Sequence, residues 1–329
     1  MKNEILPKQG VRLSPAPDYV ELLPKMGKLH KINLHTHSTV SDGNFTPEAL
    51  KKLYMEHGYS AVAFTDHRKC VPHTSLTDEN FVALTGVEVD FNYRDESGNI
   101  RKVVHINALS RIPNIEREYD GMELNVGKVK ETIKMLKDDN FIVTMNHPVW
   151  SDMSTEDIIN MNGYDCMEVF NSIGVMFNNY TDDSGYYEYF LRSGGKAIPI
   201  AADDCHRIFE DGSPFVEYFC GFNVVKTDEL TYASIIGAID SGATFASTGP
   251  MFKNLWLEGD VMHVECSPVS SVFVHGKYLH YKVSDVERTD CITHTELNIS
   301  GLRAISPYIW VQLRDTHGGK AWAMPYWFE

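Results

Sequence analysis

The chain has 329 residues, enough for roughly two domains, and its 43% hydrophobic and 23% charged residues are typical of a globular protein. Its formal net charge of −15 excludes general nucleic-acid binding through a basic surface. No apolar run reaches the roughly 20 residues of a membrane span, and the first residues lack a secretory signal pattern, so we expect a cytoplasmic protein that binds no membrane.

Between about residues 31 and 248, short apolar runs alternate with amphipathic segments, which indicates repeated β-α units. The four prolines in the first 30 residues indicate an irregular arm before this region. Strands are predicted at residues 31–37, 59–67, 82–89, 102–109, 141–148, 165–171, 197–204 and 220–225, and helices at 46–58, 127–139, 186–194 and 229–242. Seven or eight mostly parallel strands fit a (β/α) barrel or a doubly wound sheet, and periodicity does not choose between them.

After residue 247 the helical pattern stops and short alternating runs follow, with turn signals about every ten residues. This pattern predicts a small β-sandwich of about 80 residues. The predicted organisation is therefore an arm at 1–30, a main domain at 31–247 and a β domain at 248–329. Five histidines in the β domain show no ligand spacing along the sequence, so no metal is assigned to them: His263, His275, His280, His294 and His317.

Side chains that bind metals recur at or near the ends of the predicted strands. His35 and His37 lie two residues apart, so both rings leave the same face of a strand. Glu88 lies within an apolar run, where an unpaired carboxylate would be costly. The complete set of candidate metal ligands is His35, His37, Asp42, His67, Glu88, His105, His147, Asp204 and His206.

The carboxyl ends of strands are where barrels and open α/β sheets place their sites. The candidate set contains nitrogen and oxygen donors and no thiolate, and the six cysteines form no CxxC pair. Such a set suits Zn, Mn or Fe ions and not a cysteine-zinc or calcium site.

The motifs LHTHSTVSDG, FTDH, GVEVD, VVHINAL, MNHP and ADDCH occur in this order over roughly residues 31–210. In this the chain resembles the PHP (polymerase and histidinol phosphatase) superfamily of metal-dependent hydrolases. The resemblance implies a distorted (β/α)7 barrel with two or three divalent metal ions at the strand ends and hydrolysis of phosphate esters. The later GATFASTGP and AWAMPYWF, with the β-rich tail, are similar to the two-domain CehA/McbA-like metallohydrolases, which implies carbamate, amide or ester hydrolysis.

Carried over to this chain, the resemblance places His35, His37 and Asp204 on a first metal. Glu88 would bridge it to a second metal, which His105 and His147 hold, and a third site would consist of Asp42, His67 and His206. Asp203 stands where a small residue is common, which leaves open which of the two neighbouring aspartates coordinates; the DxH spacing favours Asp204.

Metals held close together would lower the pKa of a bridging water and supply a hydroxide nucleophile, while a neighbouring metal polarises the phosphoryl or acyl oxygen. Asp66 could orient a ligand or merely cap its strand, and Glu168 is a similar supporting candidate. Arg68 and Arg207 each follow a candidate ligand and could pair with a substrate phosphate, or could be plain surface residues.

The leading hypothesis is a metal-dependent phosphoesterase that acts, through a metal-bridged hydroxide, on a small phosphorylated metabolite or a nucleotide-like phosphodiester. The alternatives are an amide, carbamate or ester metallohydrolase and a non-catalytic metal-binding scaffold. Exonuclease activity is disfavoured by the −15 charge. The expected partner is a small phosphate-containing substrate, and no pattern specifies an oligomeric state.

Overall fold

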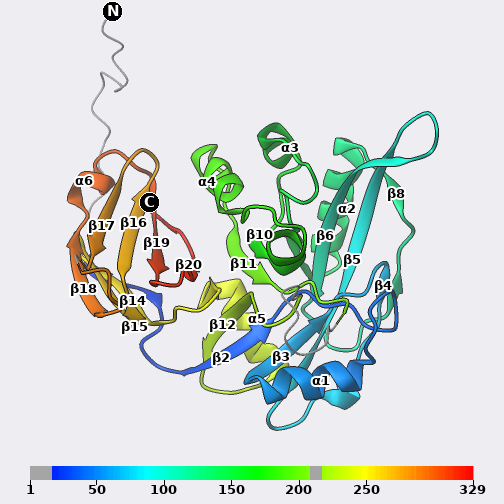
Figure 1. Cartoon of the computed structure of the whole chain (residues 1–329), viewed down its shortest axis with the longest axis horizontal. Helices are drawn as coiled ribbons and strands as arrows, with labels where there is room; N and C mark the ends of the chain where they lie inside the picture. Colours follow the sequence, from blue (N-terminus) through cyan, green and yellow to red (C-terminus); the bar gives the residue numbers. More distant parts are fainter. Residues whose placement is uncertain (1–16, 208–216, 286, 329) are drawn as a thin grey trace, which may run out of the picture.

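The computed structural model describes residues 17–207, 217–285 and 287–328. Figure 1 shows two parts side by side: an α/β part, and a β-rich part formed mainly by the C-terminal residues. None of the helices in these described ranges is long and apolar enough to cross a membrane.

Eight strands run across the sheet of the α/β part in the order β11-β10-β9-β6-β5-β3-β2-β12. They are β2 (Lys28–Asn33), β3 (Tyr59–Phe64), β5 (Val82–Arg94), β6 (Ile100–Ser110), β9 (Phe141–Met145), β10 (Cys166–Asn171), β11 (Ile198–Ala202) and β12 (Phe222–Thr227). Of the short strands, β4 (Lys69–Cys70) and β7 (Arg117–Glu118) pair with each other, and β8 (Met122–Glu123) pairs with β5. All eight predicted strands are thus present.

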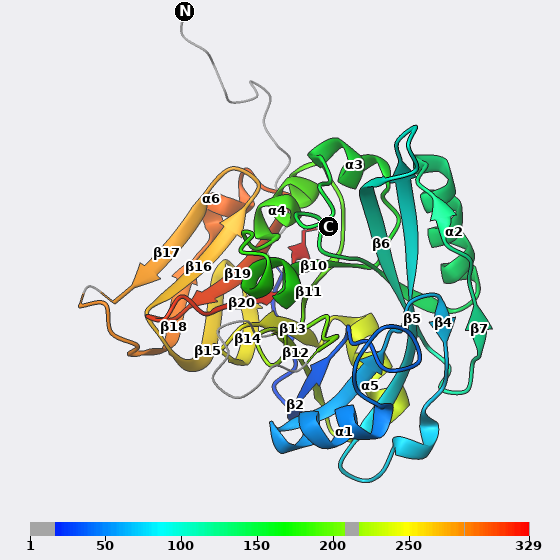
Figure 2. The same ribbon diagram turned by 45° about the vertical axis from the view of Figure 1, so that its right-hand side comes forward.

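The helices cover the outside of this sheet (Figure 2). They are α1 (Pro47–Glu56), α2 (Val126–Asp138), α3 (Thr155–Asn160), α4 (Ser184–Arg192) and α5 (Tyr232–Ser241). There is also a short 3₁₀ turn η1 (Thr74–Leu76), and a π-helical turn η2 (Ile173–Phe177) lies at the cavity described below. Helix α1 begins where the sequence predicts, because the Thr46 hydroxyl accepts a hydrogen bond from the Ala49 N–H and Pro47 needs no partner in the first turn. It buries Leu50 and Tyr54 against β3.

The expectation of mostly parallel strands fails on both sides of β6 and at the β12 end of the sheet. Strands β5 and β6 pair antiparallel, as do β6 and β9, and β12 and β2. The reason for the first pair is the short connection at residues 95–99, which is too short for a crossover and folds as a hairpin turn. Asp95 holds this turn by accepting hydrogen bonds from the N–H groups of Ser97 and Asn99.

The architecture is a mixed α/β fold with one large sheet, and closure into a barrel is not confirmed. The two outer strands β11 and β12 approach each other without a ladder of backbone hydrogen bonds between them. Instead the buried Asn223 side chain accepts from the Ala201 N–H at 3.0 Å and donates to the Ala201 carbonyl at 2.8 Å. A side-chain amide thus replaces strand pairing at this seam.

The C-terminal residues form two packed layers of strands. One layer has the order β1-β14-β15-β18, in which β1 (Val20–Leu23) comes from the N-terminal arm, and the other continues the main sheet as β13-β20-β19-β16-β17. The elements are β13 (Thr244–Ser247), β14 (Phe252–Glu258), β15 (Val261–Val269), β16 (Ser271–Gly276), β17 (His280–Ser284), β18 (Ile292–Asn298), α6 (Ser300–Arg303), β19 (Tyr308–Arg314), β20 (Lys320–Ala323) and β21 (Tyr326–Trp327). Inward residues such as Val264, Val274 and Val311 belong to one buried core, as a sandwich requires. The domain boundary at residue 248 stays a prediction, because β13 pairs with both β12 and β20.

The N-terminal arm is not irregular throughout, as the sequence led us to expect. Residues 1–16 lie outside the described part, but β1 (Val20–Leu23) pairs antiparallel with β14, and β2 already begins at Lys28. Leu23 is buried in the sandwich core, which supplies the reason for this pairing. Pro24 directly follows the strand and ends it without interrupting it.

Candidate metal centre

The nine predicted ligands gather at one end of the central sheet. Seven of them line a cavity of about 380 Å³, and the other two, His35 and His37, contact Glu88 and Asp204 from within the protein. They follow β2 (His35, His37, Asp42), β3 (His67), β9 (His147) and β11 (Asp204, His206), or lie within β5 (Glu88) and β6 (His105). Their donor atoms form three groups.

The first group contains His35, His37 and Asp204. The two Nε2 atoms of the histidines lie 3.2 Å apart, and Asp204 Oδ1 lies 3.1 Å from the first and 3.2 Å from the second. Ligand atoms about 2.1 Å from a shared metal lie about 3.0–3.4 Å from one another, so this triangle has the dimensions of one face of a coordination shell. Asp204 Oδ1 is buried and accepts no hydrogen bond, which also fits a metal ligand.

The second group contains Glu88, His105 and His147. Glu88 Oε1 lies 3.1 Å from His105 Nδ1 and 3.5 Å from His147 Nε2. The same oxygen lies 3.3 Å from His35 Nε2, and Oε2 lies 3.2 Å from His37 Nε2. Glu88 is therefore placed between the first and second groups, as a bridging carboxylate would be.

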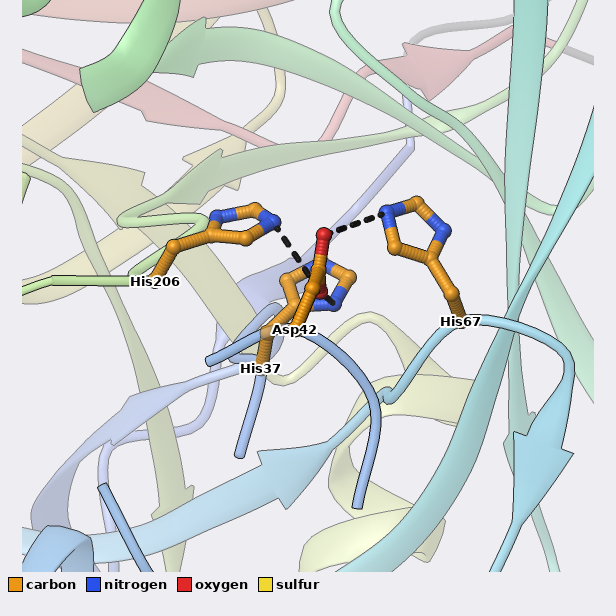
Figure 3. Close-up of side chains that lie close together, drawn as sticks. All are labelled: His37, Asp42, His67 and His206. Carbon is orange, nitrogen blue, oxygen red and sulfur yellow. Dashed lines mark ion pairs between the residues drawn. The ribbon is translucent and has the colours of Figure 1, made fainter. Parts of the chain in front are cut away.

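The third group contains His37, Asp42, His67 and His206, and Figure 3 shows Asp42 lying among the three rings. Asp42 Oδ1 lies 3.6 Å from both His37 Nδ1 and His206 Nε2, and Oδ2 lies 3.7 Å from His67 Nε2. The Asp42 side chain is 55% exposed, whereas Glu88 is 1% exposed. The third group is thus wider and more open to solvent than the first two.

The charges within the centre are coupled to one another. Burial opposes protonation of His35, but the nearby carboxylates of Asp204, Glu88 and Glu168 outweigh it and raise its pKa well above the usual value. The same balance between burial and the carboxylates raises the pKa of His37 to about 10. Burial likewise opposes ionisation of Glu88 and Asp204, yet the surrounding imidazoles hold both pKa values well below normal. The cluster therefore favours positive charge, which a divalent ion held by these donors would supply.

Two candidate ligands have an unusual backbone conformation. The φ angle is 26° at His147 and 52° at Asp204, in the left-handed region that non-glycine residues rarely adopt. Such conformations cost about 1–3 kcal/mol and cluster at functional sites. The two strained residues thus lie just after β9 and β11, at the end of the sheet where the candidate ligands gather.

The predicted supporting residue Glu168, in β10, contacts two of the donor groups. Its Oε1 lies 2.7 Å from His35 Nδ1, and its Oε2 accepts a hydrogen bond from the His147 backbone N–H. A carboxylate on the outer nitrogen of a histidine orients the ring and fixes its tautomer. Glu168 therefore positions a donor atom without itself facing the cavity.

Asp66 supports the loop that carries Asp42. Its carboxylate accepts hydrogen bonds from the backbone N–H and hydroxyl groups of both Ser38 and Ser41, at 2.7 to 3.1 Å. These contacts go to the turn after β2 that carries Asp42, and not to the neighbouring His67 ring.

Asp203 and Asp204 are neighbours in the sequence, but their side chains have different surroundings. Asp203 is fully buried and accepts hydrogen bonds from Tyr54, Ser172 and three backbone N–H groups of the segment 219–221. Burial raises the pKa of Asp203 to about 6, although these donors oppose the shift. Asp204 alone lies among the candidate ligands.

The two arginines occupy different surroundings. Arg207 lines the cavity together with seven candidate ligands. Arg68 pairs with Asp90, with 3.2 Å between Nε and Oδ1, and lines a neighbouring hollow that also reaches Asp42 and His67. Arg68 does not line the cavity that Arg207 shares with the seven candidate ligands.

Several polar residues of the centre were not found from the sequence. The Asn146 side chain donates to Glu88 Oε1, Asn171 donates to Asp204 Oδ2, and the Ser151 hydroxyl lies 3.0 Å from His147 Nδ1. The only signal was their closeness to a ligand or a strand end, as in MNHP and EVFN. Trp150 was also missed, and its ring lies 4.9 Å from that of His147.

No protein-family model and no curated protein matches the chain. Among solved structures it is similar to a two-domain protein from Bacteroides vulgatus that contains a predicted PHP-like metal-dependent phosphoesterase, with 14% identity, a TM-score of 0.45, and coverage of 98% of this chain and 99% of that one. An amidohydrolase from Chromobacterium violaceum, solved with sulfate and no metal, has 15% identity, a TM-score of 0.42, and coverage of 65% and 96%. A protein from Bifidobacterium adolescentis, provisionally named a metal-dependent phosphoesterase, has 15% identity, a TM-score of 0.37, and coverage of 55% and 90%. Because all these TM-scores lie below 0.5, the function has to follow from the chemistry of the site itself.

Proposed function

We propose that this protein is a multinuclear metal-dependent hydrolase of the PHP type. It acts on the phosphoester bond of a small phosphorylated metabolite or a nucleotide-like phosphodiester. The observation that carries the proposal is the position of Glu88, a buried carboxylate whose two oxygens lie within 3.5 Å of nitrogen atoms from five histidines. We also propose that the curved sheet is the distorted (β/α)7 barrel of that superfamily, closed at the Asn223 seam.

Each donor group would hold one Zn, Mn or Fe ion: His35, His37 and Asp204 the first, His105 and His147 with Glu88 the second, and Asp42, His67 and His206 the third. When bound, such ions acidify a coordinated water and stabilise the charge that develops on the phosphoryl oxygen. Glu168 holds a proton on His35 Nδ1, so the lone pair of Nε2 stays directed into the centre. Arg207 at the cavity wall would pair with a substrate phosphate.

A second candidate function is hydrolysis of an amide, carbamate or ester. One observation favours it: the same cavity is also lined by the apolar side chains of Trp150, Ile173 and Phe177. An uncharged organic group would lie against these side chains without needing a cationic partner.

The test is turnover by protein loaded separately with Mn²⁺ or Zn²⁺ on four substrates: a phosphomonoester, a phosphodiester, an aryl carbamate and an aryl ester. Chelated protein and Glu88→Gln are the inactive references, and Glu79→Gln, at an exposed position, is the matched control. We expect chelator-sensitive phosphate hydrolysis that Glu88→Gln lowers at least about 100-fold. Cleavage of only the carbamate or ester would favour the second candidate, and activity that survives in Glu88→Gln would refute both.

A further inference from the structure

Two short motifs in the β-sandwich have the same form: His263-Val264-Glu265 in β15 and His294-Thr295-Glu296 in β18. The strands pair antiparallel with His263 opposite Glu296 and Glu265 opposite His294. Met262 and Val264 on β15 are buried in the core, so His263 and Glu265 point to the outer face of the sandwich. The pairing thus places two histidines and two glutamates in alternation on one surface.

Three of these side chains converge on one point. His263 Nδ1 lies 3.2 Å from Glu296 Oε1, and His294 Nε2 lies 4.0 Å from the same oxygen. His263 Nδ1 is shielded from solvent and has no hydrogen-bond partner. This imidazole nitrogen has no hydrogen-bond partner and lies close to a carboxylate oxygen that a second imidazole also approaches, an arrangement that a metal ion bound by all three side chains would satisfy.

The surroundings hold the His263 ring in place. The Trp256 ring lies parallel to it, with 4.6 Å between the ring centres and 3° between the planes. The other nitrogen of His263, Nε2, lies 3.8 Å from Glu258 Oε2. The side chain is 13% exposed, whereas those of His294 and Glu296 are 51% and 57% exposed. One ligand is therefore fixed, and two can close on an ion from the solvent side.

We propose that His263, His294 and Glu296 form a metal site on the outer face of the β-sandwich, separate from the centre at the strand ends. Two imidazoles and one carboxylate select a borderline divalent ion such as Zn²⁺, Ni²⁺ or Cu²⁺ over Mg²⁺ or Ca²⁺. Water completes the coordination, because two of the three ligands face solvent. The chain's charge of −15 favours cation capture at this surface.

The role of such an ion is to join two strands. β18 is the edge strand of the layer β1-β14-β15-β18, held by β15 on one side only. A metal bound to His263 on β15 and to His294 and Glu296 on β18 links this edge to the interior of the layer. This site has no ligand spacing in the sequence, because His263 and His294 lie about 30 residues apart and come together only when β15 pairs with β18.

The test uses full-length protein that has first been loaded with Zn²⁺, and Cu²⁺ is the probe. Cu²⁺ binds nitrogen and oxygen donors more tightly than Zn²⁺ and therefore replaces any Zn²⁺ at this site. Cu²⁺ quenches a nearby indole, and Trp256 stacks directly on His263. The titration is run in a Trp150→Phe background, which removes the indole beside the strand-end centre. We expect saturable quenching with one equivalent of Cu²⁺, lost when Trp256→Phe is added. His294→Ala and Glu296→Gln should each weaken the apparent Kd at least tenfold.

His317→Ala, at an exposed histidine in a hairpin turn of the same domain, is the matched control and should titrate like its parent. His294 and Glu296 lie on the surface, so their variants are expected to fold, and circular dichroism checks this. Quenching curves for His294→Ala and Glu296→Gln that superimpose on the control would overturn the proposal, and so would a Trp256 signal that Cu²⁺ does not change. Neither result depends on hydrolytic activity, so the proposed function is tested separately.

Discussion

Glu168 shows how one residue outside the cavity can control the donors within it. It is completely buried, and its two oxygens are divided between two donor groups. Oε1 holds the His35 ring, while Oε2 accepts from the backbone of His147 and from the Asn171 side chain. A single carboxylate thus sets the position of one donor in the first group and of the chain that carries a donor in the second.

Glu168→Gln should therefore weaken metal binding without removing a ligand. The amide cannot stabilise the His35 ring as a carboxylate does, and loss of such a partner typically costs 10- to 100-fold in metal affinity. Competition with a chromophoric chelator measures this affinity, with Glu79→Gln as the exposed control. An unchanged affinity in Glu168→Gln would show that His35 is positioned by other contacts.

At this scale the sequence pointed to the side chains that the fold brings together and to Glu168, but not to the amides around them. His35, Glu88 and Asp204 are conspicuous because charged or basic side chains at the ends of apolar runs need a chemical reason. Asn146 and Asn171 are ordinary amides in ordinary positions. Their roles depend on which side chains the fold brings within 3.1 Å, and no sequence spacing encodes that.

Among the elements, Asp183 links three segments around the cavity. Its Oδ1 accepts a hydrogen bond from the Val149 N–H after β9, and its own N–H donates to the Val169 carbonyl in β10, at the start of α4. Burial raises the pKa of Asp183 from the ordinary 3.8 to about 8. Between these two pH values the carboxyl is therefore protonated in the folded protein but ionised in the unfolded chain.

A carboxyl with a raised pKa stabilises the folded state while it is protonated. That contribution is complete below about pH 4 and is lost as the pH rises through about 8, at up to about 1.4 kcal/mol per pH unit. The side chain of Asp183→Asn does not titrate, so the variant lacks this pH dependence. Between pH 6 and pH 8 the unfolding free energy of the wild type should therefore fall by about 2 kcal/mol relative to that of the variant. Urea unfolding at both pH values measures the difference, and parallel pH profiles would contradict it.

The sequence predicted the eight strands of the α/β part and four of its five helices, because these depend on local periodicity and caps such as Thr46. It did not predict how strands pair. The β5–β6 hairpin and the seam at Asn223 depend on contacts between segments, and β1 depends on the core that Leu23 enters. The His263 cluster was invisible for the same reason, since it exists only in the register of β15 with β18.

The molecule as a whole is joined by a sheet that runs from the α/β part into the sandwich. β13 pairs with β12 on one side and with β20 on the other. The Trp322 side chain in β20 is fully buried and shares one hydrophobic cluster with Tyr187 of α4 and Val169 of β10. Lys320 pairs with Asp182, in the segment between η2 and α4 that adjoins the cavity. The sandwich therefore supports the wall of the metal centre.

Trp322→Ala should for this reason disturb both parts together. Truncating a buried tryptophan to alanine costs about 3–5 kcal/mol, and here the cavity it leaves adjoins residues of both parts. We expect the midpoint of urea unfolding to fall by the same amount whether it is followed by Trp256 fluorescence in the sandwich or by metal release from the strand-end centre. His317→Ala should leave both midpoints unchanged. If the midpoint for Trp256 fluorescence fell while the midpoint for metal release did not, the two parts would unfold independently. The prediction would then be wrong, because a core shared by both parts would lower both midpoints together.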